Sequence, residues 1–282
     1  MTLVDYKGLE ILDPEPTGAG GLAIQDNFVH IADALEELPL ENNDAVIYVR
    51  RGEDDVESAD NLRAAYAAAC DLTPGGNALS ATNRAVCFVP PGRYDFGTGD
   101  DDNHGLVLDT EFVDLVSLSG SPEDTVLTSV IATASRGTLE QTADDVLIRG
   151  FRIENMRDSS TGLPSDETLP SAYFPSTALA NAKVVDCEFV AGSLHVRSMR
   201  ILVEYSGTFT NCTSGNPLSF GGGGTASGTF TNCKGGNTAF GANGTASGTF
   251  INCTGLIASF GALVTASGTF VNCTGGENSF GG

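Results

Sequence analysis

The sequence predicts an all-β fold, a single-stranded parallel β-helix with a small helical region at its N-terminal end. The stretches GTASGTFTNC, GTASGTFINC and VTASGTFVNC end at Cys233, Cys253 and Cys273, a fixed spacing of 20 residues, and a looser copy ends at Cys212. This period is too short for paired helices, which need about 33 residues per unit. The copies are also rich in Thr, Ser and Gly, which are poor helix interiors. A coil of short strands and tight bends fits both observations.

Residue parity within one copy predicts which side chains fill the coil. In TASGTF, Ala226, Gly228 and Phe230 fall on one face of a strand and the intervening Thr and Ser residues on the other. Each coil leaves its backbone groups to its neighbours, about 4.8 Å away, so that identical residues stack into ladders.

Four ladders follow from this stacking. We expect two phenylalanine columns, a column of thiols packed as small apolar groups, and a buried row of asparagine amides that bond along the stack at a bend. Their members are Phe209, Phe230, Phe250 and Phe270; Phe220, Phe240, Phe260 and Phe280; Cys212, Cys233, Cys253 and Cys273; and Asn211, Asn232, Asn252 and Asn272.

The chain divides into three parts. Residues 1–40 read as an attachment segment with a short amphipathic helix, because Phe28, Ile31, Ala32 and Leu35 form one apolar stripe. Residues 41–205 read as the cap and irregular coils of the β-helix, and residues 206–282 as four regular coils of about 20 residues.

The second part begins with recognisable elements. A strand is expected over 45–49, and a helix over about 59–72 with Ser58 as its N-cap and TPGG (73–76) as its stop. The stretch RAVCFVPPGRYDFG (84–97) then predicts a strand, a Pro-Gly turn and a second strand.

These elements carry a resemblance to a known family. NLRAAYAAAC followed by a strand and VPPGRYDF resembles the N-terminal cap and first coil of the pectin-lyase-like superfamily, and DDVLIRGFRIEN (144–155) and AKVVDCEFVAG (182–192) are similar to its coils. The resemblance covers roughly 45–282 and implies a right-handed single-stranded parallel β-helix. That superfamily includes polysaccharide lyases, hydrolases, phage tailspikes and tail fibres, so the resemblance leaves activity open. Residues 1–40 are similar to the segments by which phage fibre proteins join a virion.

The charge distribution and the targeting signals restrict the kinds of partner and the location expected for this protein. All of the formal net charge of −22 lies in residues 1–205, and such a surface repels nucleic acid and anionic membranes. We expect no membrane insertion, since no apolar run approaches the roughly 20 residues that span a bilayer. Seven cysteines without a visible signal peptide favour synthesis in a reducing compartment. We expect the protein to be made in the host cytoplasm and to reside in a virion.

The catalytic candidates are Arg152 and Glu154, which share the outward face of a strand if Phe151 and Ile153 point inward. The superfamily's hydrolases use paired carboxylates, and its lyases an Arg or Lys base. A surface ion pair between the two residues is the favoured interpretation.

Asp100, Asp101 and Asp102 are the metal candidates, because clustered carboxylates bind calcium. An EF-hand-like spacing is absent, and a solvated acidic turn is favoured. No other cofactor is expected.

The outward rows of the repeats are candidate binding surfaces. They resemble the flat threonine arrays of ice-binding β-helices, although a solvated β face with good strand propensity is the default interpretation. The rows are Thr225, Ser227 and Thr229; Thr245, Ser247 and Thr249; and Thr265, Ser267 and Thr269.

Together these observations predict a virion-type structural protein, a tail-fibre or tailspike component, and favour a non-catalytic support or binding role over an enzyme. The alternatives are a polysaccharide lyase or hydrolase, and a surface adhesin or ice-binding protein. The uncapped NSFGG stretch predicts a homo-oligomer, with a trimer favoured, or contact with other virion proteins. A surface glycan is a further candidate partner.

Overall fold

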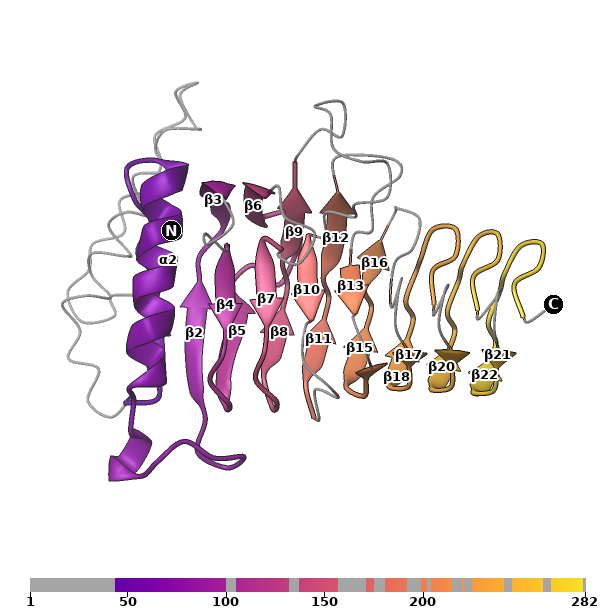
Figure 1. Ribbon diagram of the computed structural model, residues 1–282. Helices are drawn as coiled ribbons and strands as arrows, with labels where there is room; N and C mark the ends of the chain where they lie inside the picture. Colours follow the sequence, from indigo (N-terminus) through magenta and orange to yellow (C-terminus); the bar gives the residue numbers. More distant parts are fainter. Residues whose placement is uncertain are drawn as a thin grey trace, which may run out of the picture. The chain divides into compact units, whose positions relative to one another are not determined.

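The computed structural model describes residues 44–99, 105–131, 137–156, 171–174, 181–191, 199–201, 204–214, 220, 225–240, 245–260 and 265–280. Within this part of the chain the strands build parallel sheets, and each turn of the chain adds one coil next to the previous one (Figure 1). The coils wind right-handed, as parallel crossovers nearly always do. The prediction of a right-handed parallel β-helix is confirmed.

A nine-stranded sheet runs the length of the described β-helix, from the cap to the last regular coil. Its strands pair in parallel and in register, so that Val184 lies opposite Phe209 and Phe209 opposite Phe230. In spatial order the strands are β1 (Val46–Tyr48), β2 (Ala85–Val89), β5 (Val113–Ser117), β8 (Leu147–Arg149), β11 (Lys183–Val185), β15 (Thr208–Thr210), β18 (Thr229–Thr231), β20 (Thr249–Ile251) and β22 (Thr269–Val271).

Three shorter sheets complete the coils. The five-stranded sheet consists of β3 (Gly92–Gly99), β6 (Thr125–Ile131), β9 (Arg152–Asn155), β12 (Glu188–Ala191) and β16 (Thr213–Ser214). One four-stranded sheet consists of β4 (Leu106–Leu108), β7 (Leu139–Gln141), β10 (Ala172–Phe174) and β13 (Met199–Ile201). The other consists of β14 (Glu204–Tyr205), β17 (Thr225–Ala226), β19 (Thr245–Ala246) and β21 (Thr265–Ala266).

The helix α2 (Asp55–Cys70) covers the first coil, and a 3₁₀ turn, η1 (Pro74–Gly76), follows it (Figure 1). The predicted start of this helix was wrong by four residues. Asp54 is the N-cap, because its carboxylate accepts the backbone N–H of Glu57 at 2.8 Å. Ser58 lies inside the first turn, where its hydroxyl donates to the Asp54 carbonyl.

The predicted strand–turn–strand at 84–97 is present, but its two strands do not pair with each other. β2 belongs to the nine-stranded sheet and β3 to the five-stranded sheet, so the Pro-Gly turn is a corner of the coil. The outcome follows from the parallel topology, in which each strand pairs with the next coil and not with its neighbour in sequence.

The two phenylalanine columns form the core of the regular coils, as predicted. Phe230 stacks on Phe250 at 5.0 Å between ring centroids, and Phe240 stacks on Phe260 at 4.8 Å. Rings of the two columns also meet edge to face, as Phe240 and Phe250 do at 5.6 Å. Each coil therefore adds the same pair of interlocking rings.

The stretch TASGTF is not one strand, and this part of the sequence interpretation was wrong. Thr225–Ala226 belongs to β17 and Thr229–Thr231 to β18, two strands of different sheets, and the chain bends at Ser227 and Gly228. A Cβ atom on Gly228 would lie 2.1 Å from the Gly207 carbonyl oxygen of the previous coil. The corner therefore needs glycine for close approach between backbones.

The predicted attachment segment 1–40, with its amphipathic stripe, lies outside the described residues. Among the helices that the structure describes, none is long and apolar enough to cross a membrane.

Candidate functional site

A ladder of alternating charges crosses the outward face of the five-stranded sheet; we call it the charge ladder, and it consists of Arg93, Glu154, Arg152 and Glu188. Glu154 Oε1 accepts a hydrogen bond from Arg152 Nε at 2.6 Å, and Arg93 NH2 lies 3.2 Å from Glu154 Oε2 in an ion pair. Arg152 NH1 lies 3.5 Å from Glu188 Oε2. The four residues come from β3, β9 and β12, so the ladder ties separate coils together.

The charge ladder is only partly solvated. The Glu154 side chain is 7% exposed, whereas that of Arg93 is 43% exposed. Arg152 and Glu154 therefore form the expected ion pair, but it is not the fully solvated surface pair that the sequence suggested. The exposed guanidinium of Arg93 covers a carboxylate that lies below it, and Arg93 also donates to the Thr128 hydroxyl at 3.0 Å.

This arrangement limits the chemistry available to Glu154. Glycoside hydrolysis needs two carboxyl groups, roughly 5–9 Å apart, that face the same sugar. Glu154 Oε1 accepts a hydrogen bond from Arg152, Glu154 Oε2 is ion-paired with Arg93, and the carboxylate of Glu188 is ion-paired with Arg152. The ladder is built to hold coils in register rather than to present an acid and a base.

A second ladder runs along the bend between the nine-stranded and five-stranded sheets; we call it the asparagine ladder. Each side-chain amide donates to the one before it: Asn232 to Asn211 at 3.0 Å, Asn252 to Asn232 at 3.1 Å and Asn272 to Asn252 at 3.3 Å. All of these residues have φ between 52° and 54°. Asparagine tolerates this left-handed conformation better than most residues, so the sequence pattern and the bend agree.

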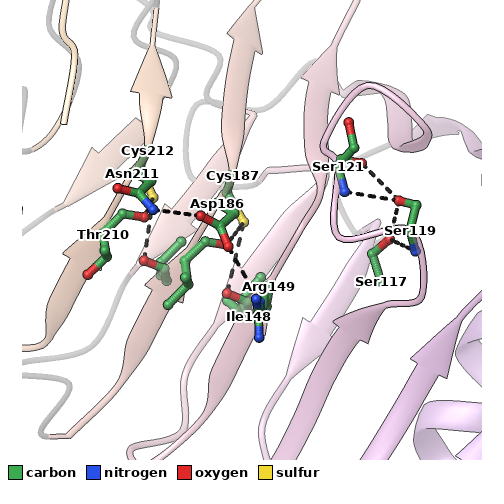
Figure 2. Close-up of polar contacts among 12 residues, drawn as sticks. Ser117, Ser119, Ser121, Ile148, Arg149, Asp186, Cys187, Thr210, Asn211 and Cys212 are labelled. Carbon is green, nitrogen blue, oxygen red and sulfur yellow. Dashed lines mark hydrogen bonds and ion pairs between the residues drawn. The ribbon is translucent and has the colours of Figure 1, made fainter. Parts of the chain in front are cut away.

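The asparagine ladder ends on a charged pair (Figure 2). Asn211 donates to Asp186 Oδ1 at 2.8 Å, and Asp186 Oδ2 lies 3.4 Å from Arg149 Nε. Asp186 thus fills the same slot as the asparagines, and its φ of 53° is the same left-handed conformation. The prediction that the amides are buried was wrong, because the residues of this ladder are exposed on the outside of the bend.

A cluster of hydroxyl groups, which the sequence analysis missed, lies after β5 (Figure 2). Ser117 Oγ lies 2.9 Å from Ser119 Oγ and 2.7 Å from the buried Thr125 hydroxyl, and Ser119 donates to the Ser121 carbonyl at 3.0 Å. Because these groups satisfy one another and the local backbone, the cluster closes a turn between β5 and β6. Among the described residues its hydrogen-bond partners are hydroxyl and backbone groups, which do not activate a nucleophile.

The cysteine column is present, and the cysteines of the described residues are free thiols. Cys233 donates to the Phe209 carbonyl at 3.6 Å and Cys253 to the Phe230 carbonyl at 3.3 Å, both across coils. Contact with Cys212 is the largest cause that raises the pKa of Cys233, and burial raises the pKa of Cys187 to about 12. These thiols are inert packing groups and not nucleophiles.

The predicted outward rows of the repeats are divided by the corner described above. Thr225 lies on β17 and Thr229 on β18, with Ser227 at the bend between them, and the same division holds in the next two coils. The three residues of each row therefore cannot form one flat face. Outward residues of a single sheet are instead Thr229 and Thr231, which flank the buried Phe230.

The candidate calcium ligands Asp100, Asp101 and Asp102 lie outside the described residues. Within the described ranges, no group of three or more His, Cys, Asp or Glu side chains is placed to hold a metal ion.

Arg93 and Glu188 are the members of the charge ladder that sequence reasoning missed. A signal existed, because GFRIEN and DCEFVA occupy equivalent positions in successive coils and place Arg152 opposite Glu188. Arg93 could not be found in this way, because Val126 of β6 lies in register between Arg93 and Arg152, and Arg93 reaches Glu154 across that intervening strand.

Comparison with known proteins finds no matching family model and no matching curated protein. Among solved structures, the pectin methylesterase of Aspergillus niger is similar with 12% identity and a TM-score of 0.45, over 84% of this chain and 87% of that one. PemA of Erwinia chrysanthemi shares 14% identity with a TM-score of 0.40, over 76% of this chain and 55% of that one. ORF18 of Geobacillus virus E2 shares 12% identity with a TM-score of 0.32, over 96% of this chain and 65% of that one.

The chain thus spans 55% of the length of the Erwinia protein. Likenesses of this size carry no argument about activity, and the fold stands on the strand pairing described above.

Proposed function

We propose that the chain is a structural component of a virus particle, of the tail-fibre or tailspike kind, with a supporting or binding role that involves no catalysis. The observation that carries the proposal is the pair of stacked phenylalanine columns beneath the asparagine ladder. Each coil repeats the same contacts with its neighbour, which is how solenoids build stiff, extendable rods.

The charge ladder supports a role without catalysis. Glu154 is nearly buried and forms ion pairs with two arginines, so its carboxylate serves the packing of coils. On the regular coils the outward strand positions are Thr, Ile and Val, which supply neither a general acid nor a general base.

The catalytic alternative is tested directly. The purified protein is incubated with methyl-esterified pectin and with polygalacturonate, and methanol, reducing ends and unsaturated products are measured. We expect no release above that of the heat-denatured protein. Release that the Glu154→Gln variant loses while remaining folded would overturn the non-catalytic role and place an active site at the charge ladder.

The virion role is tested on particles. Particles from the host that carries the gene are purified on a density gradient, and their peptides are identified by mass spectrometry. We expect peptides of this chain to sediment with the major particle proteins. A chain that stays with the soluble fraction, while known particle proteins sediment, would contradict the proposal.

We further propose that the chain assembles with other polypeptides, most simply as a three-fold homo-oligomer. Exposed apolar side chains on the regular coils support this, because Phe280 is 47% exposed and Val271 is 44% exposed. Sedimentation at micromolar concentration, beside a Phe280→Glu variant, tests it. A wild-type chain that remains a soluble monomer would contradict self-association.

A further inference from the structure

The outward face of the nine-stranded sheet becomes a regular array in its last four strands. Each strand there has the form Thr-Phe-X, in which the phenylalanine points inward and its two neighbours point outward. We call this surface the threonine array; its residues are Thr208, Thr210, Thr229, Thr231, Thr249, Ile251, Thr269 and Val271.

The array is regular in two directions. Across strands, Thr229 lies directly opposite Thr208 and Thr249, at the strand spacing of about 4.8 Å. Along a strand, the two outward residues are separated by two steps of about 3.3 Å. The strands follow one another along the β-helix (Figure 1), and their residues pair without an offset in register. A surface with two fixed repeats resembles the face of a crystal more than the irregular surface of a globular protein.

The array rests on a stiff foundation. Phe230 and Phe250, which lie beneath it, are fully buried and stack with their planes 6° from parallel. Side-chain ladders of this kind hold sheets flat. Threonine also has a branched Cβ, which restricts χ1, so each hydroxyl and methyl group is held in place by its own backbone.

The chemistry of the array is uniform. Every position carries at least one methyl group, and none of the eight side chains is charged. No hydrogen bond joins the hydroxyls of Thr229, Thr231 or Thr249 to another residue of the described ranges, and all three side chains are partly exposed. These hydroxyls are therefore free to hydrogen-bond with water. The methyl groups between them cannot form hydrogen bonds, so water on this surface can bond only to the hydroxyls or to other water molecules.

We propose that the threonine array binds ice. A surface of evenly spaced hydroxyl and methyl groups can order a layer of water with the same two repeats, and such a layer can merge with a crystal lattice. A glycan or protein partner is less well matched, because the array offers neither an aromatic platform nor a charged anchor, the groups that dominate those interfaces. The array differs from the rows expected from the sequence, since it lies on one sheet and includes Thr231 and Ile251.

The experiment measures ice-crystal growth in a frozen sucrose solution and thermal hysteresis by osmometry. The wild-type chain should slow recrystallisation and depress the growth temperature of ice below its melting point. Thr231→Tyr, at the centre of the array, should lose most of this effect. Thr245→Tyr is the matched control, because Thr245 is an outward, partly exposed threonine of the same coils on a different sheet, and it should retain the effect.

Circular dichroism and thermal melting establish that each variant is folded. If Thr231→Tyr unfolds, Thr231→Val replaces it, since valine keeps the shape and exchanges the hydroxyl for a methyl group; it should reduce the hysteresis. A wild-type chain whose ice growth matches that of an equal concentration of serum albumin would overturn the proposal. If Thr231→Tyr and Thr245→Tyr lost the same share of the thermal hysteresis, the array would not be the ice-binding site. Neither result bears on the virion role.

Discussion

Phe230 and Phe250 lie face to face, with ring centroids 5.0 Å apart and ring planes 6° from parallel, although 20 residues separate them in the chain. Both are fully buried. Phe240 and Phe260 meet the side of the same column edge to face at 5.6 Å and 5.8 Å. The interior of each regular coil is therefore shared with the coils on both sides, and no coil has a core of its own.

Truncating one ring should destabilise the whole stack. Phe250→Ala should lower the free energy of unfolding by about 3–5 kcal/mol, as for other buried aromatic residues, and the lost stacking contacts place it at the upper end. The control is Thr249→Ala, which changes an outward residue of the same strand and should cost under about 0.5 kcal/mol. Urea unfolding curves measure both. Similar losses would contradict the inward and outward assignment.

The regular coils were the most predictable part of the fold. Their period places Phe, Asn and Cys in fixed columns, and parallel stacking then follows from backbone hydrogen bonding alone. The bend at Ser227 and Gly228 was not predictable from parity, because a continuous strand and a cornered one place the same residues inward. Close approach of Gly228 to the previous backbone is a tertiary contact that local pattern does not encode.

The charge ladder was less predictable for a different reason. Arg152 and Glu154 are two residues apart on one strand, so their pairing could be expected. Arg93 reaches Glu154 from another coil, and no repeat in that part of the chain fixes which residues face each other. The nearly buried state of Glu154 likewise depends on its surroundings in the fold and not on its own strand.

Glycine at the corner should be essential. A Cβ atom on Gly248 would lie 2.1 Å from the Gly228 carbonyl oxygen, a backbone atom that cannot rotate away. Gly248→Ala should therefore lower stability by about 1–3 kcal/mol. Ser247→Ala, at the neighbouring exposed position, should change it by less than about 0.5 kcal/mol. Thermal melts of the two variants measure these losses. If Gly248→Ala lost as little stability as Ser247→Ala, the coils could separate at this corner.

The asparagine ladder should contribute through two separable effects. Asn232 donates to Asn211 and accepts from Asn252, and each bond is worth about 0.5–1.5 kcal/mol. Its φ of 54° would cost a residue such as alanine about 1–2 kcal/mol of stability, because alanine tolerates this left-handed conformation poorly. Asn232→Ala should lose both contributions, whereas Asn232→Gly should lose mainly the bonds. Chemical denaturation measures the difference; equal losses would mean that the left-handed backbone carries no penalty.

Removing the buried charge should matter more than removing the exposed one. Glu154→Gln leaves two guanidinium groups without their carboxylate and should cost about 3 kcal/mol. Glu188→Gln changes a partly exposed carboxylate 3.5 Å from Arg152 and should cost under about 1 kcal/mol. Unfolding in low and high salt checks this: the Glu188 effect should shrink with salt, and the Glu154 effect should persist. A larger loss of stability in Glu188→Gln than in Glu154→Gln would contradict a structural role for the charge ladder.

The thiol column should show itself in reactivity and in the dependence of stability on pH. Cys233 and Cys253 are buried, and their pKa values are raised, in each case chiefly by contact with a neighbouring thiol. Only Cys273 of these three is partly exposed. A bulky thiol reagent near pH 8 should therefore label Cys273 well before the other two. Cys70 is also partly exposed, so a Cys273→Ser variant in a Cys70→Ser background should lack the fast fraction that the Cys70→Ser single variant retains. All seven cysteines should label after unfolding without reductant.

The sign of the pH effect follows from the same shifts. Burial raises the pKa of Cys187 to about 12, whereas an unfolded thiol ionises near pH 8.5. The raised value contributes stability that is fully present below about pH 8.5 and is lost as the pH rises toward about 12. Urea midpoints should accordingly fall between about pH 9 and pH 11, and the fall should be shallower in a Cys187→Ala variant. Midpoints that stay level over this range, or thiols already paired before reduction, would contradict the protonated column.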